Sequence, residues 1–267
     1  MKKKIYGLSA INIELTNRCN KACWMCGRRK VEKDYPKLAL QYGDMDFNLL
    51  KIIAPQIPPR TVIQFHKDGE GLLYPRFGEA VRLFKNQTIK CLTTNGKLLF
   101  EKANEIIGNL DTISLSIIQD DPEADEQYEV IKKFLEIKGS QKPFVIYRLL
   151  GDVSSDRYEN LPGIIVRRIL HSPMGSFKYQ KKTTIPEIGF CLDLMNHLVI
   201  SNTGEVSFCV RFDPNKIGVL GNIQEQTLSE IWNGEMRQEI INLHVAGRRD
   251  MVTLCSTCEY WGVPTSP

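Results

Sequence analysis

This 267-residue sequence lacks the features of membrane, secreted and nucleic-acid-binding proteins. It contains no apolar run of the length that a transmembrane helix needs. The first residues carry lysines but lack the long apolar segment of a signal peptide. Basic residues occur in short clusters such as Lys2-Lys3-Lys4, and the net charge is only +4, so a nucleic-acid-binding stripe is not indicated. We therefore expect a cytoplasmic protein that binds neither membranes nor nucleic acid.

The composition is that of a globular chain. Hydrophobic residues make up 42% and charged residues 25% of the sequence, which is enough apolar material for a sizeable core. The length allows one or two domains. The chain has eight cysteines, and disulfides are rare in the reducing cytoplasm. We therefore interpret the cysteines as metal ligands rather than as disulfide partners.

Three of the cysteines stand close together. Cys19, Cys23 and Cys26 follow the apolar segment 10–15 in the stretch Cys-Asn-Lys-Ala-Cys-Trp-Met-Cys. Thiolate-bound iron–sulfur clusters normally take four cysteines, so three cysteines leave one iron open. An open metal position is where a substrate or cofactor binds. The alternative is a zinc knuckle or three buried structural thiols.

The spacing resembles the CxxxCxΦC motif of the radical S-adenosylmethionine (radical SAM) superfamily, in which Φ is usually aromatic. Here Met25 stands at Φ and the aromatic Trp24 precedes it. The resemblance implies that the three cysteines are catalytic and hold a [4Fe–4S] cluster whose open iron binds SAM. An external one-electron donor such as flavodoxin or ferredoxin would then drive cleavage of SAM. The resulting 5′-deoxyadenosyl radical would abstract a hydrogen atom from the substrate.

The order of apolar and amphipathic segments predicts the fold class. Strands are predicted at 10–15, 61–66, 89–94, 112–117, 144–149 and 163–169, and helices at 47–53, 77–85, 98–108 and 126–138. Strands that alternate with helices indicate βαβ units and a parallel sheet. We therefore predict an α/β fold with a partial (β/α)6-type barrel over residues 8–180. In parallel barrels the chemistry lies at the carboxyl ends of the strands, where the cysteine loop stands.

The other candidate cofactor residues follow the same strand ends. Gly69 and Glu70 resemble the family's GGEPLL element, with two substitutions, and the resemblance implies that they hold the methionyl amino group of SAM. Asn95 lies in a Thr-Asn-Gly turn after the third strand. Ser116 and Arg148 stand where the family contacts the ribose and carboxylate of SAM. For these two, a polar residue that only closes a strand is the alternative.

The last third of the chain, residues 186–267, has a different pattern. A hairpin is predicted at 197–209 around an Asn-Thr-Gly turn, followed by helices at 228–233 and 236–244. Four cysteines lie here: Cys191, Cys209, Cys255 and Cys258. This order resembles the Twitch and SPASM extensions of radical SAM enzymes. The resemblance implies an auxiliary [4Fe–4S] cluster on these four cysteines, with no iron left open, and hence two clusters and SAM as cofactors.

Six polar or aromatic residues are expected near the barrel mouth: Lys67, Tyr74, His171, Arg211, Phe212 and Asp213. They favour a small polar substrate, such as a sugar or an aminocyclitol-like molecule, over a flat apolar one. For Lys67 and Arg211, a surface charge is the alternative.

The kind of reaction depends on Cys91, the cysteine that belongs to neither group. A redox-neutral epimerisation needs a hydrogen-atom donor, and Cys91 is the one candidate in the sequence. We expect Cys91 to lie inside a strand with its side chain directed away from the mouth, so we favour oxidation. The alternatives are a radical SAM epimerase or a peptide-modifying enzyme. A non-catalytic iron–sulfur or zinc protein is the second alternative.

Overall fold

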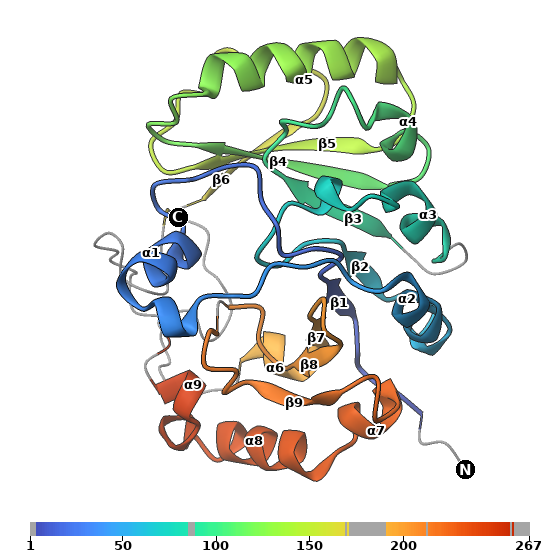
Figure 1. Ribbon diagram of the computed structural model, residues 1–267, viewed down its shortest axis with the longest axis vertical. Coiled ribbons are helices and arrows are strands. Elements are labelled where there is room, and N and C mark those ends of the chain that lie inside the picture. The colour runs from blue at the N-terminus through green and yellow to red at the C-terminus, as the bar shows by residue number, and fades with distance from the viewer. Residues whose placement is uncertain are drawn as a thin grey trace.

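The computed structural model describes residues 4–84, 89–168, 170, 191–211, 213–256 and 258. In this part of the chain the strands form one sheet in the order β6-β5-β4-β3-β2-β1-β7-β8-β9 (Figure 1). The strands are β1 (Ala10–Ile13), β2 (Val62–Gln64), β3 (Lys90–Thr94), β4 (Thr112–Ile118), β5 (Phe144–Leu150), β6 (Ile164–Arg168), β7 (His197–Ile200), β8 (Glu205–Ser207) and β9 (Val219–Asn222). The pairings from β6 to β7 are parallel, and those of β7–β8 and β8–β9 are antiparallel.

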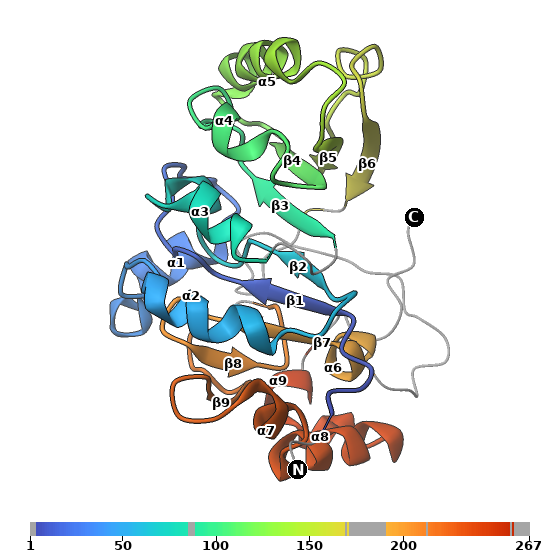
Figure 2. The same ribbon diagram turned by 90° about the vertical axis from the view of Figure 1, so that its right-hand side faces the viewer.

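The described helices lie around the curved sheet. They are α1 (Gly27–Asp34), α2 (Phe47–Ile53), α3 (Phe77–Arg82), α4 (Ala103–Ile106), α5 (Ala124–Lys138), α6 (Leu192–Asn196), α7 (Leu228–Trp232), α8 (Glu235–Val245) and α9 (Thr253–Ser256). Figure 2 shows α1–α5 together on one side of β1–β4. Among the described helices, none has the length and apolar character needed to cross a membrane.

The two faces of the sheet differ in chemistry. On the face toward the helices, Ile63 and Ile113 have no exposed surface and belong to the hydrophobic core. Successive side chains of a strand point to opposite faces. The register of β2 to β5 therefore places Gln64, Ser116 and Arg148 on the other face. We call this polar face the inner face of the partial barrel.

Helix α5 illustrates how the sequence builds the outer layer. Ile131 and Phe134 are fully buried, and each such side chain contributes about 1.5–3 kcal/mol by leaving water. Asp125 and Glu126 lie in the first turn, where a carboxylate interacts favourably with the helix dipole. The helix ends at Gly139, whose φ of 52° is easy for glycine and costly for other residues.

The predicted α/β fold is confirmed. The six predicted barrel strands form in order, with ends that lie within two residues of the prediction. The helix predicted at 98–108 is shorter and covers only Ala103–Ile106. The segment before it is a series of turns that begins at Gly96, where φ is +83° and Leu99 donates to the Gly96 carbonyl.

The hairpin of the last third is not separate from the barrel sheet. Strand β7 pairs with β1 in parallel, from Ala10 beside His197 to Ile13 beside Ile200. A reciprocal capping box of Thr227 and Glu230 begins α7. The division between 180 and 186 falls outside the described residues, so the two domains of 8–180 and 186–267 stay a prediction.

Candidate functional site

The three-cysteine loop lies at the carboxyl end of β1, and α1 begins directly after Cys26. The Cys26 backbone N–H donates to the Cys23 carbonyl over 3.1 Å. Burial, followed by the charges of Cys19 and Cys26, raises the pKa of the Cys23 thiol to about 11. The three sulfurs are therefore close enough to interact electrostatically.

The donor set suits a metal cluster that brings its own positive charge. Among the described residues, no three Cys, His, Asp or Glu side chains are already arranged as metal ligands. The thiols of the loop are nevertheless gathered and free of disulfides. Burial and the charges of its two neighbours disfavour the thiolate of Cys23, and a bound cation removes that cost as the proton is released. Cys19, Cys23 and Cys26 could hold an iron–sulfur cluster on these grounds.

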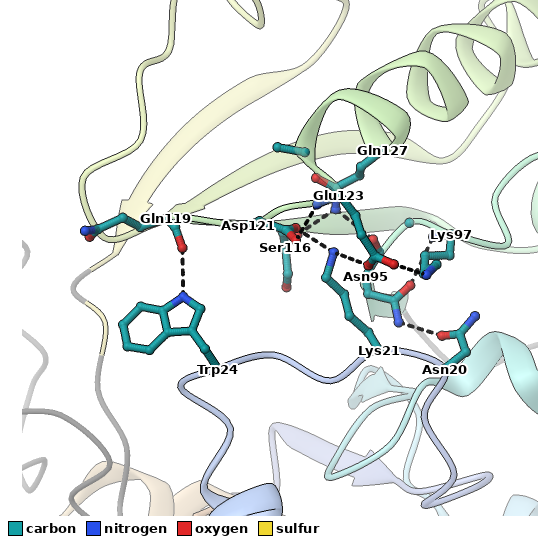
Figure 3. A network of polar contacts seen from close by, with 12 residues as sticks. Asn20, Lys21, Trp24, Asn95, Lys97, Ser116, Gln119, Asp121, Glu123 and Gln127 are labelled. Carbon is teal, nitrogen blue, oxygen red and sulfur yellow. Dashed lines mark hydrogen bonds and ion pairs between the residues drawn. The ribbon is translucent and has the colours of Figure 1, made fainter.

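A network of charged groups, of which only the Lys21–Asp121 pair is buried, joins the loop to the ends of β3 and β4. The Lys21 ammonium lies 2.5 Å from Asp121 and 3.2 Å from Glu123, and Lys97 lies 2.6 Å from Glu123. Figure 3 shows Lys21 reaching from the cysteine loop to the two carboxylates that precede α5. We call these four residues the Lys21 network.

Two neutral hydrogen bonds fix the loop on either side of Lys21. The Asn95 side-chain amide donates to Asn20 over 2.8 Å, and the Trp24 indole N–H donates to the Gln119 carbonyl over 2.9 Å. Both bonds are visible in Figure 3. The predicted cofactor residue Asn95 therefore contacts the loop directly.

Gly69 is required by close packing. A Cβ built at Gly69 would lie 2.3 Å from the Thr16 carbonyl oxygen and 2.7 Å from that of Arg18. Only glycine lets the β2 end approach the cysteine loop this closely. The backbone N–H of Glu70 donates to the same Arg18 carbonyl over 2.7 Å.

The Glu70 side chain is buried and accepts hydrogen bonds from three groups of the protein. It is 2% exposed, and its carboxylate accepts bonds from Leu72 N at 3.1 Å, Thr94 Oγ1 at 2.8 Å and Asn95 N at 2.8 Å. Burial raises the pKa of Glu70, and these bonds oppose that shift. The carboxylate joins the ends of β2 and β3, and its direct contact with a cofactor stays a prediction.

The Glu70→Ala substitution should therefore act first on stability. It leaves the donors of Leu72, Thr94 and Asn95 without their acceptor, which costs on the order of 3 kcal/mol of unfolding free energy. Urea unfolding of the metal-free protein measures this loss, and SAM affinity should fall with it. Glu79→Ala is the control, because Glu79 is an exposed carboxylate on α3. Unchanged stability with lost SAM binding would instead show that Glu70 acts on the cofactor.

Ser116 and Arg148 lie side by side on the inner face, as the register of β4 and β5 shows. Burial, then the charges of Arg168 and Arg211, lower the pKa of Arg148. Arg148, Arg168 and Arg211 together favour the binding of an anionic group, such as a carboxylate, on the inner face. Burial and Arg148 lower the pKa of His66 to about 4, so its imidazole is neutral at pH 7.

A cavity of about 350 Å³ that includes several charged side chains lies between the barrel mouth and the hairpin region. Its lining includes three of the predicted mouth residues, Lys67, Arg211 and Asp213, together with Glu14 and Cys209. The prediction for Tyr74 was wrong: it is buried in the core, and its hydroxyl donates to the Met45 carbonyl. His171 and Phe212 lie outside the described residues.

Glu14 connects the two parts of this cavity. Its carboxylate accepts a bond from Asp68 N at 3.0 Å, at the β2 end, and one from Asn202 N at 3.3 Å, in the hairpin turn. Burial raises the pKa of Glu14, whereas the charge of Lys67 opposes this shift. The carboxylate thus links the barrel to the hairpin at the edge of the cavity.

The four late cysteines come together although the first and the last are 67 positions apart. Burial, then the charges of Cys209, Cys258 and Cys191, raises the pKa of Cys255 to about 12. Cys191 and Cys209 also pack against the small apolar cluster that contains Cys255. Arg249 donates to the carbonyls of Cys255 and Cys258. Four gathered thiols fit a fully ligated cluster.

Cys91 lies on the inner face, contrary to the predicted direction of its side chain. It pairs with Gln64 and Thr112, and its sulfur accepts a bond from the Thr112 hydroxyl over 2.9 Å. It is nevertheless separated from the mouth, because it stands three residues before the end of β3, or about 10 Å along the strand. Its distance along the strand, and not its direction, keeps it from the mouth.

Sequence reasoning missed the Lys21 network and the burial of Glu70. The sequence did contain one signal for the Lys21 network. Lys21 is a charged residue inside a closely spaced cysteine motif, where a buried ammonium requires a partner of opposite charge. The partner could not be found, because Asp121 is 100 residues away in sequence.

Comparisons with known proteins agree with this arrangement. A model of the SPASM iron–sulfur cluster-binding domain matches residues 191–259. Over 268 aligned residues the chain is 26% identical to the S-adenosyl-L-methionine-dependent 2-deoxy-scyllo-inosamine dehydrogenase of Niallia circulans, with 96% of this chain and 95% of that protein covered. It is 28% identical over 170 residues to the tungsten-containing aldehyde ferredoxin oxidoreductase cofactor-modifying protein of Pyrococcus furiosus, with 56% and 45% covered.

Solved structures show the same fold. The crystal structure of BtrN in complex with AdoMet and 2-DOIA matches with a TM-score of 0.66 and 22% identity, over 99% of this chain and 97% of that chain. Streptococcus suis SuiB bound to S-adenosylmethionine matches with a TM-score of 0.55 and 13% identity, over 95% and 71%.

Proposed function

We propose that this chain, a radical SAM enzyme with a C-terminal SPASM-type iron–sulfur domain, oxidises a hydroxyl group of an aminocyclitol-like substrate to a ketone. The nearly full-length similarity to an aminocyclitol dehydrogenase supports this reaction. Within the proposal, Cys19, Cys23 and Cys26 hold the cluster that binds SAM, and the late cysteines hold a second [4Fe–4S] cluster. An external one-electron donor and a cytoplasmic location belong to the same proposal.

The remaining assignments follow the inner face of the sheet. Arg148, with its neighbouring cations, is suited to the SAM carboxylate, and Ser116 beside it is suited to the ribose. Asn95 and Gly69 shape the approach to the loop. Cys19, Cys23 and Cys26 would hold the cluster, which together with SAM would supply a radical able to remove a hydrogen atom from the substrate.

The observation that carries the proposal is the cavity between barrel and hairpin. Lys67, Asp68 and Asp213 give it charged and hydrogen-bonding groups that suit the hydroxyl and amino groups of an aminocyclitol. Cys209 lies in the same lining. A substrate bound there is next to Cys209, so the second electron of an oxidation would have a short path to a cluster that Cys209 holds.

The test uses the anaerobically reconstituted protein with SAM, a reductant and 2-deoxy-scyllo-inosamine in deuterated water. We expect a ketone that is lighter than the substrate by two hydrogen atoms, with one 5′-deoxyadenosine formed per product. A product of unchanged composition that carries solvent deuterium on carbon would indicate epimerisation and reject the oxidation. Zinc binding without SAM cleavage would reject the enzyme assignment altogether.

A further inference from the structure

Lys21 stands inside the gap between Cys19 and Cys23, and its charge is buried. Its side chain is 5% exposed, and that of its partner Asp121 is 4% exposed. A buried ammonium is costly unless an opposite charge lies against it. The 2.5 Å contact with Asp121 supplies that charge.

Asp121 is itself held in place by the backbone. One carboxylate oxygen bonds Lys21, and the other accepts from the Glu123 N–H over 3.1 Å at the start of α5. Glu123 lies between two cations, Lys21 and Lys97. The position of Lys21, and with it the cysteine loop, is therefore tied to the β4–α5 connection (Figure 3).

The pair also lies close to the metal-binding thiols. A cavity of about 540 Å³ is lined by Lys21 and Asp121 together with Cys23 and Trp24. Charges act more strongly in a poorly solvated region than in water. The net charge around an iron–sulfur cluster is one of the factors that set its reduction potential.

We propose that Lys21 and Asp121 form a neutral buried pair that positions the cysteine loop and whose two charges act in opposite directions on the reduction potential of the cluster bound by it. This inference rests on the proposed function, because it assumes an iron–sulfur cluster on Cys19, Cys23 and Cys26. The cluster takes one electron from the external donor and becomes more negative by one charge. Lys21 favours this reduced state, and Asp121 opposes it.

Charge-removing variants of the pair test the proposal through a potential rather than through activity. Redox titration of the cluster-loaded protein, followed by electron paramagnetic resonance, measures both clusters. Lys21→Met should move the SAM-binding cluster to a lower potential, and Asp121→Asn should move it to a higher one. The double variant is neutral again and should return close to the wild-type value. The auxiliary cluster is the internal control and should not shift.

Two exposed residues on α5 provide matched controls. Lys132→Met and Asp125→Asn remove the same charges from side chains that are 42% and 98% exposed, and they should leave both potentials unchanged. Equal shifts in these controls, or shifts of the same sign in Lys21→Met and Asp121→Asn, would overturn the inference.

The experiment also distinguishes a structural role from an electrostatic one. A pair that only stiffens the loop would lose iron in both single variants, and the cluster that remains would keep its potential; this result rejects the potential-setting role. If Lys21→Met binds no iron, the Asp121→Asn variant alone decides the test. An unchanged or lower potential of its SAM-binding cluster contradicts the inference. A wild-type protein that shows no SAM-binding cluster would refute the proposed function instead.

Discussion

Replacing Cys19, Cys23 and Cys26 together by alanine should abolish the formation of 5′-deoxyadenosine and leave about half of the iron. The thiols gather at the β1 end, where Cys23 responds to the charges of the other two, and their charges are therefore close to one another. The late cysteines stand in a different part of the fold and should keep their own cluster, about four of the eight irons. Iron analysis and chromatographic detection of 5′-deoxyadenosine measure both results.

Cys91→Ala is the matched control for this experiment. It removes a half-buried cysteine from the inner face of β3 that belongs to neither group. Full iron content and normal SAM cleavage are expected. Continued formation of 5′-deoxyadenosine by the triple variant would show that the cofactor site lies elsewhere.

Cys209→Ala should stop the oxidation of substrate while SAM cleavage continues. Cys209 lines the cavity proposed for the substrate, and the charges of Cys258 and Cys191 act on its thiol, whose pKa burial raises to about 12. Without this ligand the auxiliary cluster should be lost, and the substrate radical has no acceptor for its second electron. Product and 5′-deoxyadenosine, measured in the same reaction, should change from equal amounts to cleavage without ketone.

Met236→Ala provides the control in the same region, because Met236 is an exposed residue on α8. Its product yield should match that of the wild type. If Cys209→Ala still formed the ketone after losing half of its iron, the auxiliary cluster would not accept the second electron. Its role would then be limited to stability.

Local patterns were sufficient to predict the barrel. Strands β1–β6 are apolar, β-branched segments separated by amphipathic ones, so the sequence of elements and the parallel order follow from short-range information. The pairing of β7 with β1 could not be predicted in this way. It depends on which strand edge is left open after the barrel strands have paired, and no local signal records that.

The site could be predicted in part. The three cysteines at 19–26, the pair at 255 and 258 and the strand ends stand out in the sequence, because thiols at short spacing are typical of metal sites. The direction of the Cys91 side chain was predicted wrongly, because a strand buried on both sides does not reveal which face is the inner one. The bonds of Glu70 to the β3 end and the ion pair of Lys21 depend on contacts between distant segments.

The position of β1 between β2 and β7 has a consequence for how the chain folds during synthesis. The contact between Ser9 and Asn196 spans 187 residues, so one edge of β1 remains unpaired until the last third of the chain has been made. Until then the nascent barrel has an open strand edge beside the cysteine loop, which is a site for aggregation. Fragments that end before His197 should therefore be recovered as insoluble material, and cluster insertion should follow completion of the chain.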